Sequence, residues 1–118
     1  MMAWDREGNI VVADCVNDRL QIIRLSDGAV LRTIGSKGSG DDQFYLPADV
    51  AFGFGGRIIV LDAYRVQVLR YSNGSHVRTI GNQGSGNGQF DRPCADLLDC
   101  QGRIIVSDSY NHRIQVLE

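Results

Sequence analysis

The sequence contains few of the residues that mark several large classes of protein. Among its 118 residues are two prolines, one lysine and three cysteines, and the cysteines show no Cys-x-x-Cys spacing. An odd number of cysteines at these positions argues against a disulfide framework. We therefore expect Cys15, Cys94 and Cys100 to be buried or half-buried free thiols.

Long apolar runs and a marked excess of either charge are also missing. No stretch approaches the roughly 18 apolar residues of a membrane-spanning helix, and the N-terminal residues lack the charged and apolar regions of a secretion signal. We expect a soluble, cytoplasmic protein. The formal net charge of −2 and the pI of about 5.6 provide no basic excess for binding nucleic acid.

The sequence repeats itself about every 46 residues. The segment from Gly35 reads GSKGSGDDQFYLP and the segment from Gly81 reads GNQGSGNGQFDRP, so their glycines, serine, glutamine, phenylalanine and proline recur in register. A second set consists of GNIVVAD from Gly8, GRIIVLD from Gly56 and GRIIVSD from Gly102. A repeat of this length indicates an array of similar supersecondary units.

Each repeat contains short runs of valine, isoleucine and leucine bounded by turn-forming residues. No run sustains an apolar period of 3.6 residues over ten residues, so the runs predict strands. Asp27-Gly28 and Asn73-Gly74 predict hairpin turns in which both residues adopt positive φ. The predicted strands of the middle repeat lie near residues 48–52, 57–62, 66–71 and 76–80. Four antiparallel strands at this period predict an all-β fold made of β-propeller blades.

The repeats resemble the NHL repeat, a family of propeller blades. The matching residues are Gly8 to Asp14 with Asn17, Arg19 and Gln21, and Gly102 to Asp108 with Asn111 to Leu117. Gly53 departs from the family, which usually has aspartate there, and the second repeat lacks the asparagine. The resemblance implies four-stranded blades at about residues 1–35 and 36–81 and a third, without its outer strand, at about 82–118. It also implies a six-bladed ring, of which three blades are half.

Three blades would leave two apolar faces uncovered, because propeller blades stack on one another through such faces. We expect the chain either to be a fragment of a longer protein or to form a homodimer that completes a ring. A dimer is the simpler assembly, because closed two-fold oligomers are the commonest kind.

The longer loops of such blades lie on one face of the ring, and there we expect a non-catalytic scaffold to bind a protein or peptide partner. Arginine and tyrosine, which are enriched at the centres of interfaces, recur in these loops. The candidate partner-binding residues are Tyr45, Tyr64, Arg92, Tyr110, His112 and Arg113.

Some of the arginines have a structural interpretation. Each repeat has an aspartate at the end of its second strand and an arginine at the start of its third, and a grafted binding site would usually break that symmetry. We expect structural ion pairs between Asp14 and Arg19, Asp62 and Arg65, and Asp108 and Arg113.

RNA binding is the alternative function, and it requires a basic face with aromatic residues. The loop face is nearly neutral, which disfavours nucleic acid. Its five cations are Arg19, Lys37, Arg65, Arg92 and Arg113, and its four anions are Asp18, Asp41, Asp42 and Asp91.

Catalysis has less support from the sequence. A related propeller family includes a metal-dependent lyase, but a metal site needs histidine and carboxylate ligands that converge. We expect His76, beside a turn between the third and fourth strands, and His112, in a loop between the second and third, to lie on opposite faces. No serine, cysteine or threonine stands with a histidine in a nucleophile motif. We expect no enzyme activity, no metal and no cofactor.

Overall fold

The computed structural model describes residues 2–41, 43–90, 95–98, 103–108 and 111–117. These residues form antiparallel β-sheets and one three-residue 3-10 turn, η1 (Cys15–Asn17), so the all-β prediction is confirmed. No helix among them is long and apolar enough to cross a membrane. Cys15 is exposed, so the expected burial of that thiol is wrong, while Cys94 and Cys100 lie outside the described residues.

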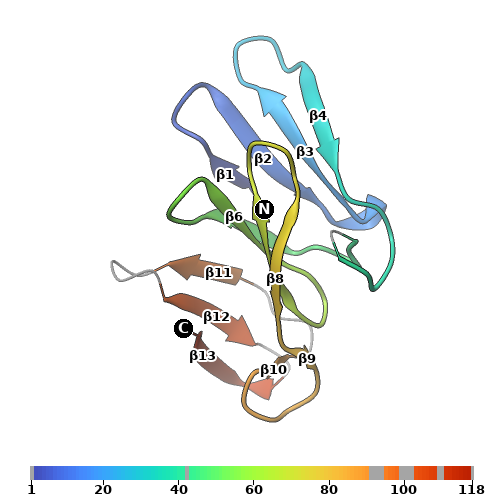
Figure 1. The fold of residues 1–118 in the computed structure, drawn as a ribbon, viewed down its shortest axis with the longest axis vertical. Coiled ribbons are helices and arrows are strands. Elements are labelled where there is room, and N and C mark those ends of the chain that lie inside the picture. The colour runs from blue at the N-terminus through green and yellow to red at the C-terminus, as the bar shows by residue number, and fades with distance from the viewer. Residues whose placement is uncertain (1, 42, 91–94, 99–102, 109–110, 118) are drawn as a thin grey trace.

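Three sheets follow one another along the chain (Figure 1). The first contains β1 (Met2–Trp4), β2 (Asn9–Asp14), β3 (Arg19–Arg24) and β4 (Val30–Ile34). The second contains β5 (Asp49–Phe52), β6 (Arg57–Leu61), β7 (Val66–Arg70) and β8 (His76–Ile80). The third contains β11 (Ala95–Leu98), β12 (Ile104–Asp108) and β13 (Arg113–Leu117), and a short parallel pair, β9 (Asn82–Gln83) with β10 (Gln89–Phe90), precedes it.

The strands of the middle repeat differ by at most one residue at either end from those predicted. Every neighbouring pair within the three sheets is antiparallel and consecutive in sequence, which is the simple up-and-down order of a meander. Among the described residues, the antiparallel sheet of the third repeat has three strands.

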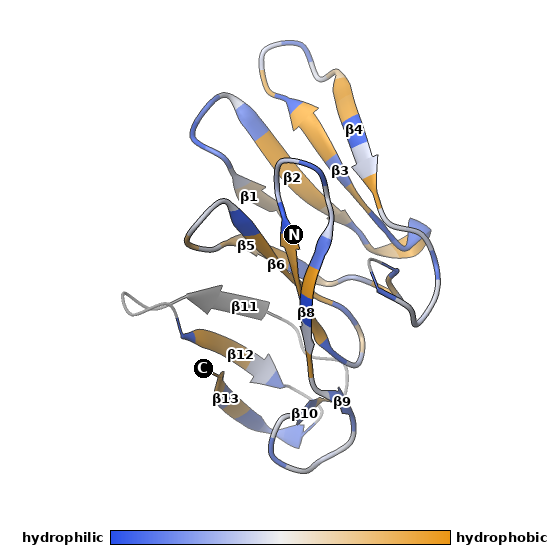
Figure 2. Ribbon diagram, viewed as in Figure 1, coloured by the Kyte–Doolittle hydropathy of each residue, from blue (hydrophilic) through white to orange (hydrophobic). Residues whose placement is uncertain are grey.

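The second sheet is buried on both faces, between the first and the third. Alternate residues of β6 point to opposite sides, as they must in a strand. Ile58 and Val60 belong to the apolar cluster shared with the first sheet, and Ile59 and Leu61 to the cluster shared with the third. Burial on both faces explains why β6 is a continuous apolar run from Ile58 to Leu61, coloured orange in Figure 2. In β7 the buried residues are apolar except for Gln67.

A phenylalanine from each long connection completes these cores. Phe44 lies in the cluster between the first two sheets and Phe90 in the cluster between the last two, and both are fully buried. Gly81 lies directly against Phe90: its φ is +84°, and a Cβ there would lie 2.5 Å from the ring. Only glycine fits at this position, because both the backbone conformation and the space exclude a side chain.

The hairpin turns are wider than predicted. Within the two dipeptides, the glycines Gly28 and Gly74 have positive φ, 73° at each, whereas Asp27 and Asn73 do not. The side chains of these two residues instead accept hydrogen bonds from the backbone N–H two residues ahead, at 3.0 and 2.9 Å. The dipeptides therefore mark the turns correctly, but the predicted geometry with two left-handed residues is wrong.

Candidate partner-binding face

The loop face consists of the connections between the second and third strands of each sheet and the long connections between sheets. The long connections cover residues 35–48 and 81–94, of which 42 and 91–94 lie outside the described residues. Hydrogen bonds between the two kinds of loop give this face its shape.

Arg65 links the connection at residues 35–48 to the second sheet. Its Nε donates to Asp62 Oδ2 at 3.1 Å, and the side chain of Asp62 is only 3% exposed. Gln67 Nε2 adds a hydrogen bond to the carbonyl of Gln43 at 2.6 Å. The remaining donors of Arg65 go to three backbone carbonyls at 2.7–3.0 Å, those of Ser39, Gly40 and Gln43.

Arg113 makes the same set of contacts 48 residues further along. It donates to Asp108 Oδ2 at 3.1 Å, and Gln115 Nε2 donates to the carbonyl of Gln89 at 2.6 Å. Its guanidinium donates to three carbonyls at 2.7–2.8 Å, those of Ser85, Gly86 and Gln89. We call each such arginine and glutamine, at or directly before the start of the third strand of a sheet, a loop-binding pair.

Each of the three aspartate–arginine pairs forms a salt bridge, with Arg19 Nε 3.0 Å from Asp14 Oδ2. Hydrogen bonds from Asn17 and then Arg19 hold the pKa of Asp14 below its ordinary value. Arg113, a candidate partner-binding residue, uses most of its N–H groups in hydrogen bonds to the long connection before its own sheet. The recurrence of a GSGxxQF segment before Arg65 and before Arg113 was the sequence signal for the loop contacts, although the sequence did not predict them.

Tyr45 and Tyr64 come together on the loop face. Their rings stack with centroids 5.9 Å apart and an interplanar angle of 9°, and Lys37 Nζ lies 5.7 Å from the centroid of Tyr45. The backbone N–H of Ala63 donates to the carbonyl of Tyr45 at 2.9 Å, which fixes the two loops side by side. Beside the rings is a hollow of about 290 Å³, bordered on its other side by β9. We call this the tyrosine hollow.

The other candidate residues are not gathered at the tyrosine hollow. His112 is exposed in a left-handed conformation at φ 54°, in the turn before β13. Arg92 and Tyr110 lie outside the described residues. Asp18, counted above as a surface anion of the loop face, is buried, and its Oδ1 accepts a hydrogen bond from the backbone N–H of Leu46 at 2.7 Å. Its role is therefore to fasten a loop.

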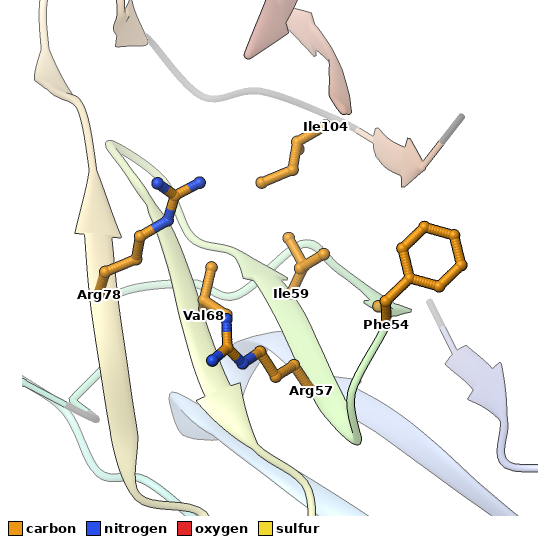
Figure 3. Close-up of a pocket in the computed structure, with 7 residues that line it drawn as sticks. Phe54, Arg57, Ile59, Val68, Arg78 and Ile104 are labelled. Carbon is orange, nitrogen blue, oxygen red and sulfur yellow. The ribbon is translucent and has the colours of Figure 1, made fainter. Parts of the chain in front are cut away.

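A second hollow, of about 240 Å³, lies between the second and third sheets (Figure 3). Arg57, Arg78 and the exposed ring of Phe54 border its apolar floor. Near the matching edge of the first two sheets, Tyr71 donates a hydrogen bond to Asp5 at 2.7 Å. Gly53 occupies the position of Asp5 in the second repeat, so the departure from the family removes that anchor.

His76 lies close to one threonine and one aspartate. His76 Nε2 lies 2.8 Å from Thr79 Oγ1 and 3.6 Å from Asp41 Oδ1. Within the described parts of the chain, no three histidine, cysteine, aspartate or glutamate side chains are grouped closely enough to hold a metal ion.

Stacked antiparallel sheets, one per repeat, with four, four and three strands among the described residues, define the class of protein: an all-β repeat protein. The family model of the NHL repeat matches residues 97–117, so the chain carries an NHL repeat and the predicted resemblance is confirmed for that segment.

The fold is also found among solved structures. The crystal structure of a "Putative exported protein" from Bacteroides fragilis matches with a TM-score of 0.66 at 17% sequence identity. The match covers 85% of this chain and 27% of that one, so this chain spans about a quarter of that protein's length. No curated protein sequence matches the chain.

Proposed function

We propose that the three sheets are blades of an NHL-repeat β-propeller and that its loop face binds a protein or peptide without catalysing a reaction. The up-and-down order of the sheets, their stacking through alternate residues and the NHL match support the propeller. A propeller carries its binding residues in loops, whose sequence varies without disturbing the stacked blades.

The observation that carries the binding proposal is the stacked pair of Tyr45 and Tyr64 beside a hollow of about 290 Å³. Tyrosines bury a large apolar area on binding and lose little conformational entropy, so they act as anchors in protein interfaces. Tyr45 is 39% exposed, and the loop contacts of Arg65 hold the rim of the hollow in place.

The arginines support a protein partner over RNA. Phosphate binding depends on cations that are free to approach the backbone of the nucleic acid. Arg65 and Arg113 donate instead to carbonyls of their own connections, and Lys37 lies against the ring of Tyr45. The described part of the loop face therefore offers aromatic contacts in place of a basic surface.

A peptide library displayed on phage would test this proposal. Peptides selected on the intact chain should lose about 30-fold in affinity on Tyr64→Ala, which is the size of an interface hot spot. Phe54→Ala, which removes an exposed aromatic ring at the second hollow, is the matched control and should leave affinity unchanged.

Two results would contradict the proposal. One is equal affinity of the Tyr64→Ala and Phe54→Ala variants for the selected peptides. The other is binding of single-stranded RNA that weakens steeply between about 50 and 200 mM salt and is insensitive to Tyr64→Ala, which would favour RNA as the ligand.

A further inference from the structure

The first sheet carries a third loop-binding pair, which lies apart from the tyrosine hollow. Arg19 and Gln21 on β3 correspond in the repeat to Arg65, directly before β7, and Gln67 on β7. The same two positions in the third sheet are Arg113 and Gln115 on β13. The salt bridge to the aspartate of the preceding strand is already formed, with Arg19 Nε 3.0 Å from Asp14 Oδ2. The arginine of this loop-binding pair is therefore already held in position by its aspartate.

The two other loop-binding pairs show what this arrangement binds. In both, the guanidinium donates to the carbonyls of the serine, the following glycine and the glutamine of a GSGxxQF segment. In both, the phenylalanine of that segment is fully buried between two sheets. The same contacts at two places in one chain define a specific mode of recognition.

No such segment lies on Arg19. Among the described residues, its guanidinium meets Asp14 and, when the amide of Gln21 is turned to accept, Gln21 Oε1 at 2.6 Å from Nη2. Its side chain is 38% exposed, compared with 13% for Arg65 and 25% for Arg113. The donors that bind loop carbonyls elsewhere thus point toward the protein's own glutamine or toward solvent.

An uncovered apolar surface lies on the same sheet. Met2 and Trp4 pair with Val12 and Ile10 of β2, as Val50 and Phe52 pair with Val60 and Ile58 in the second sheet. Val50 is 3% exposed because the first sheet and Phe44 cover it, whereas Met2 is 63% and Trp4 59% exposed. The first sheet therefore has both parts of the binding site: the loop-binding pair and an apolar surface for a phenylalanine.

We propose that Arg19, Gln21 and the face bearing Met2 and Trp4 form a binding site for a GxxGSGxxQF loop of another repeat of this type. The occupant comes from outside residues 1–118, because Arg65 and Arg113 already bind both such segments of the chain. The loop supplies three carbonyls to the guanidinium of Arg19 and its phenylalanine to the apolar face.

The glycines and the glutamine of the loop determine which sequences fit. A Cβ on Gly38 or Gly40 would lie 2.3 or 2.8 Å from Gln43 Oε1, and the matching distances for Gly84 and Gly86 to Gln89 Oε1 are 2.4 and 2.8 Å. The glutamine side chain folds back over the loop and accepts a hydrogen bond from the N–H of Gly40 or Gly86, at 3.0 and 2.9 Å. A side chain at any of these glycines would have to displace the glutamine side chain from that N–H.

A chain extended at its N-terminus would test the site. Placing a second copy of residues 35–48, GSKGSGDDQFYLPA, directly before Met1 puts the added loop in the register that residues 35–48 have with β5. We expect the extension to raise the midpoint of thermal unfolding by about 5 °C, as a gain of a few hydrogen bonds and a buried ring does in a domain of this size.

The matched variants decide whether the gain comes from this site. Arg19→Ala in the extended chain, or alanine in place of the added phenylalanine, should abolish the rise. Arg65→Ala should lower the midpoints of the extended and unextended chains equally, and Tyr64→Ala should leave the rise intact even if the tyrosine hollow binds nothing. The proposal is wrong if the extension gives no rise, or if the rise survives Arg19→Ala.

Discussion

Tyr71 joins two repeats of the chain through one side chain. Its hydroxyl donates to Asp5 Oδ2 at 2.7 Å, its ring meets Phe52 edge-on at 5.0 Å between centroids, and the guanidinium of Arg32 lies 5.2 Å from its centroid. Burial, followed by the hydrogen bond to Asp5 and the charge of that carboxylate, raises the pKa of Tyr71 to about 12. Burial alone would raise the pKa of Asp5, but hydrogen bonds from Tyr71 and the backbone outweigh it and lower the pKa.

Tyr71→Phe should reveal this contact as a change in the pH dependence of stability. The raised pKa means that Tyr71 stabilises the fold below pH 10 and that this contribution is lost as the pH rises from about 10 to about 12. The variant should lose about 1 kcal/mol at pH 7 and should show a shallower decline between those two pH values. Urea unfolding at pH 7, 10 and 12 measures both effects.

Tyr64→Phe is the control for that measurement, because the hydroxyl of Tyr64 donates to none of the described residues and its ring lies at the loop face. It should leave both the stability at pH 7 and the alkaline decline unchanged. Equal alkaline declines in wild type and Tyr71→Phe would show that the hydrogen bond to Asp5 does not contribute.

At the level of whole elements, an arginine stands at the start of β3 and directly before β7, but the two arginines differ in what they bind. Arg65 fixes a long connection to β7 through three carbonyls and neutralises the buried Asp62. Arg19 has only its own aspartate and glutamine among the described residues. The pair therefore separates the contribution of the loop contacts from that of the salt bridge.

Arg65→Ala should destabilise the protein by about 3 kcal/mol, because it removes the cation beside the buried Asp62 and three hydrogen bonds to loop carbonyls. Arg19→Ala should cost clearly less, because its salt bridge is partly exposed and solvent screens it. Midpoints of urea unfolding for the two variants, measured side by side, test the difference. Similar losses would mean that the loop contacts add little to the salt bridge.

On the scale of the whole molecule, apolar surface is exposed on the two outer sheets. Ile114 and Val116 on β13 are 72% and 56% exposed, although Leu20 and Ile22, at the same positions of β3, are buried against the second sheet. Trp4 is exposed on the opposite side of the stack, on the first sheet. The two surfaces correspond to the two sides of each internal interface between sheets.

We predict that copies of the chain associate, the third sheet of one against the first sheet of the next, with a homodimer as the simplest closed form. Val116→Asp should raise the dissociation constant at least about tenfold, because it places a charge in an apolar contact. Leu25→Asp, at an exposed turn, is the control. Light scattering over a range of concentrations measures both, and a monomeric wild type at high concentration would rule the association out.

The sequence by itself determined the repeat, the all-β class and, to within one residue, the bounds of the four strands in the middle repeat. Runs of Val, Ile and Leu between turn-forming residues, such as residues 57–61, favour strands, and this pattern can be recognised from a short segment alone. The aspartate–arginine pairs also followed from the sequence, since Asp62 and Arg65 stand at the two ends of one short loop.

Only the tertiary structure decided which side chains of the loops are free to bind a partner. Arg65 contacts carbonyls more than 20 residues away, Asp18 is buried beneath Leu46, and Tyr45 meets Tyr64 across two loops. Each of these contacts depends on how a connection folds over the neighbouring sheet, which no short segment encodes. Exposure has the same origin, because equal positions of β3 and β13 are buried or open according to whether another sheet packs against them.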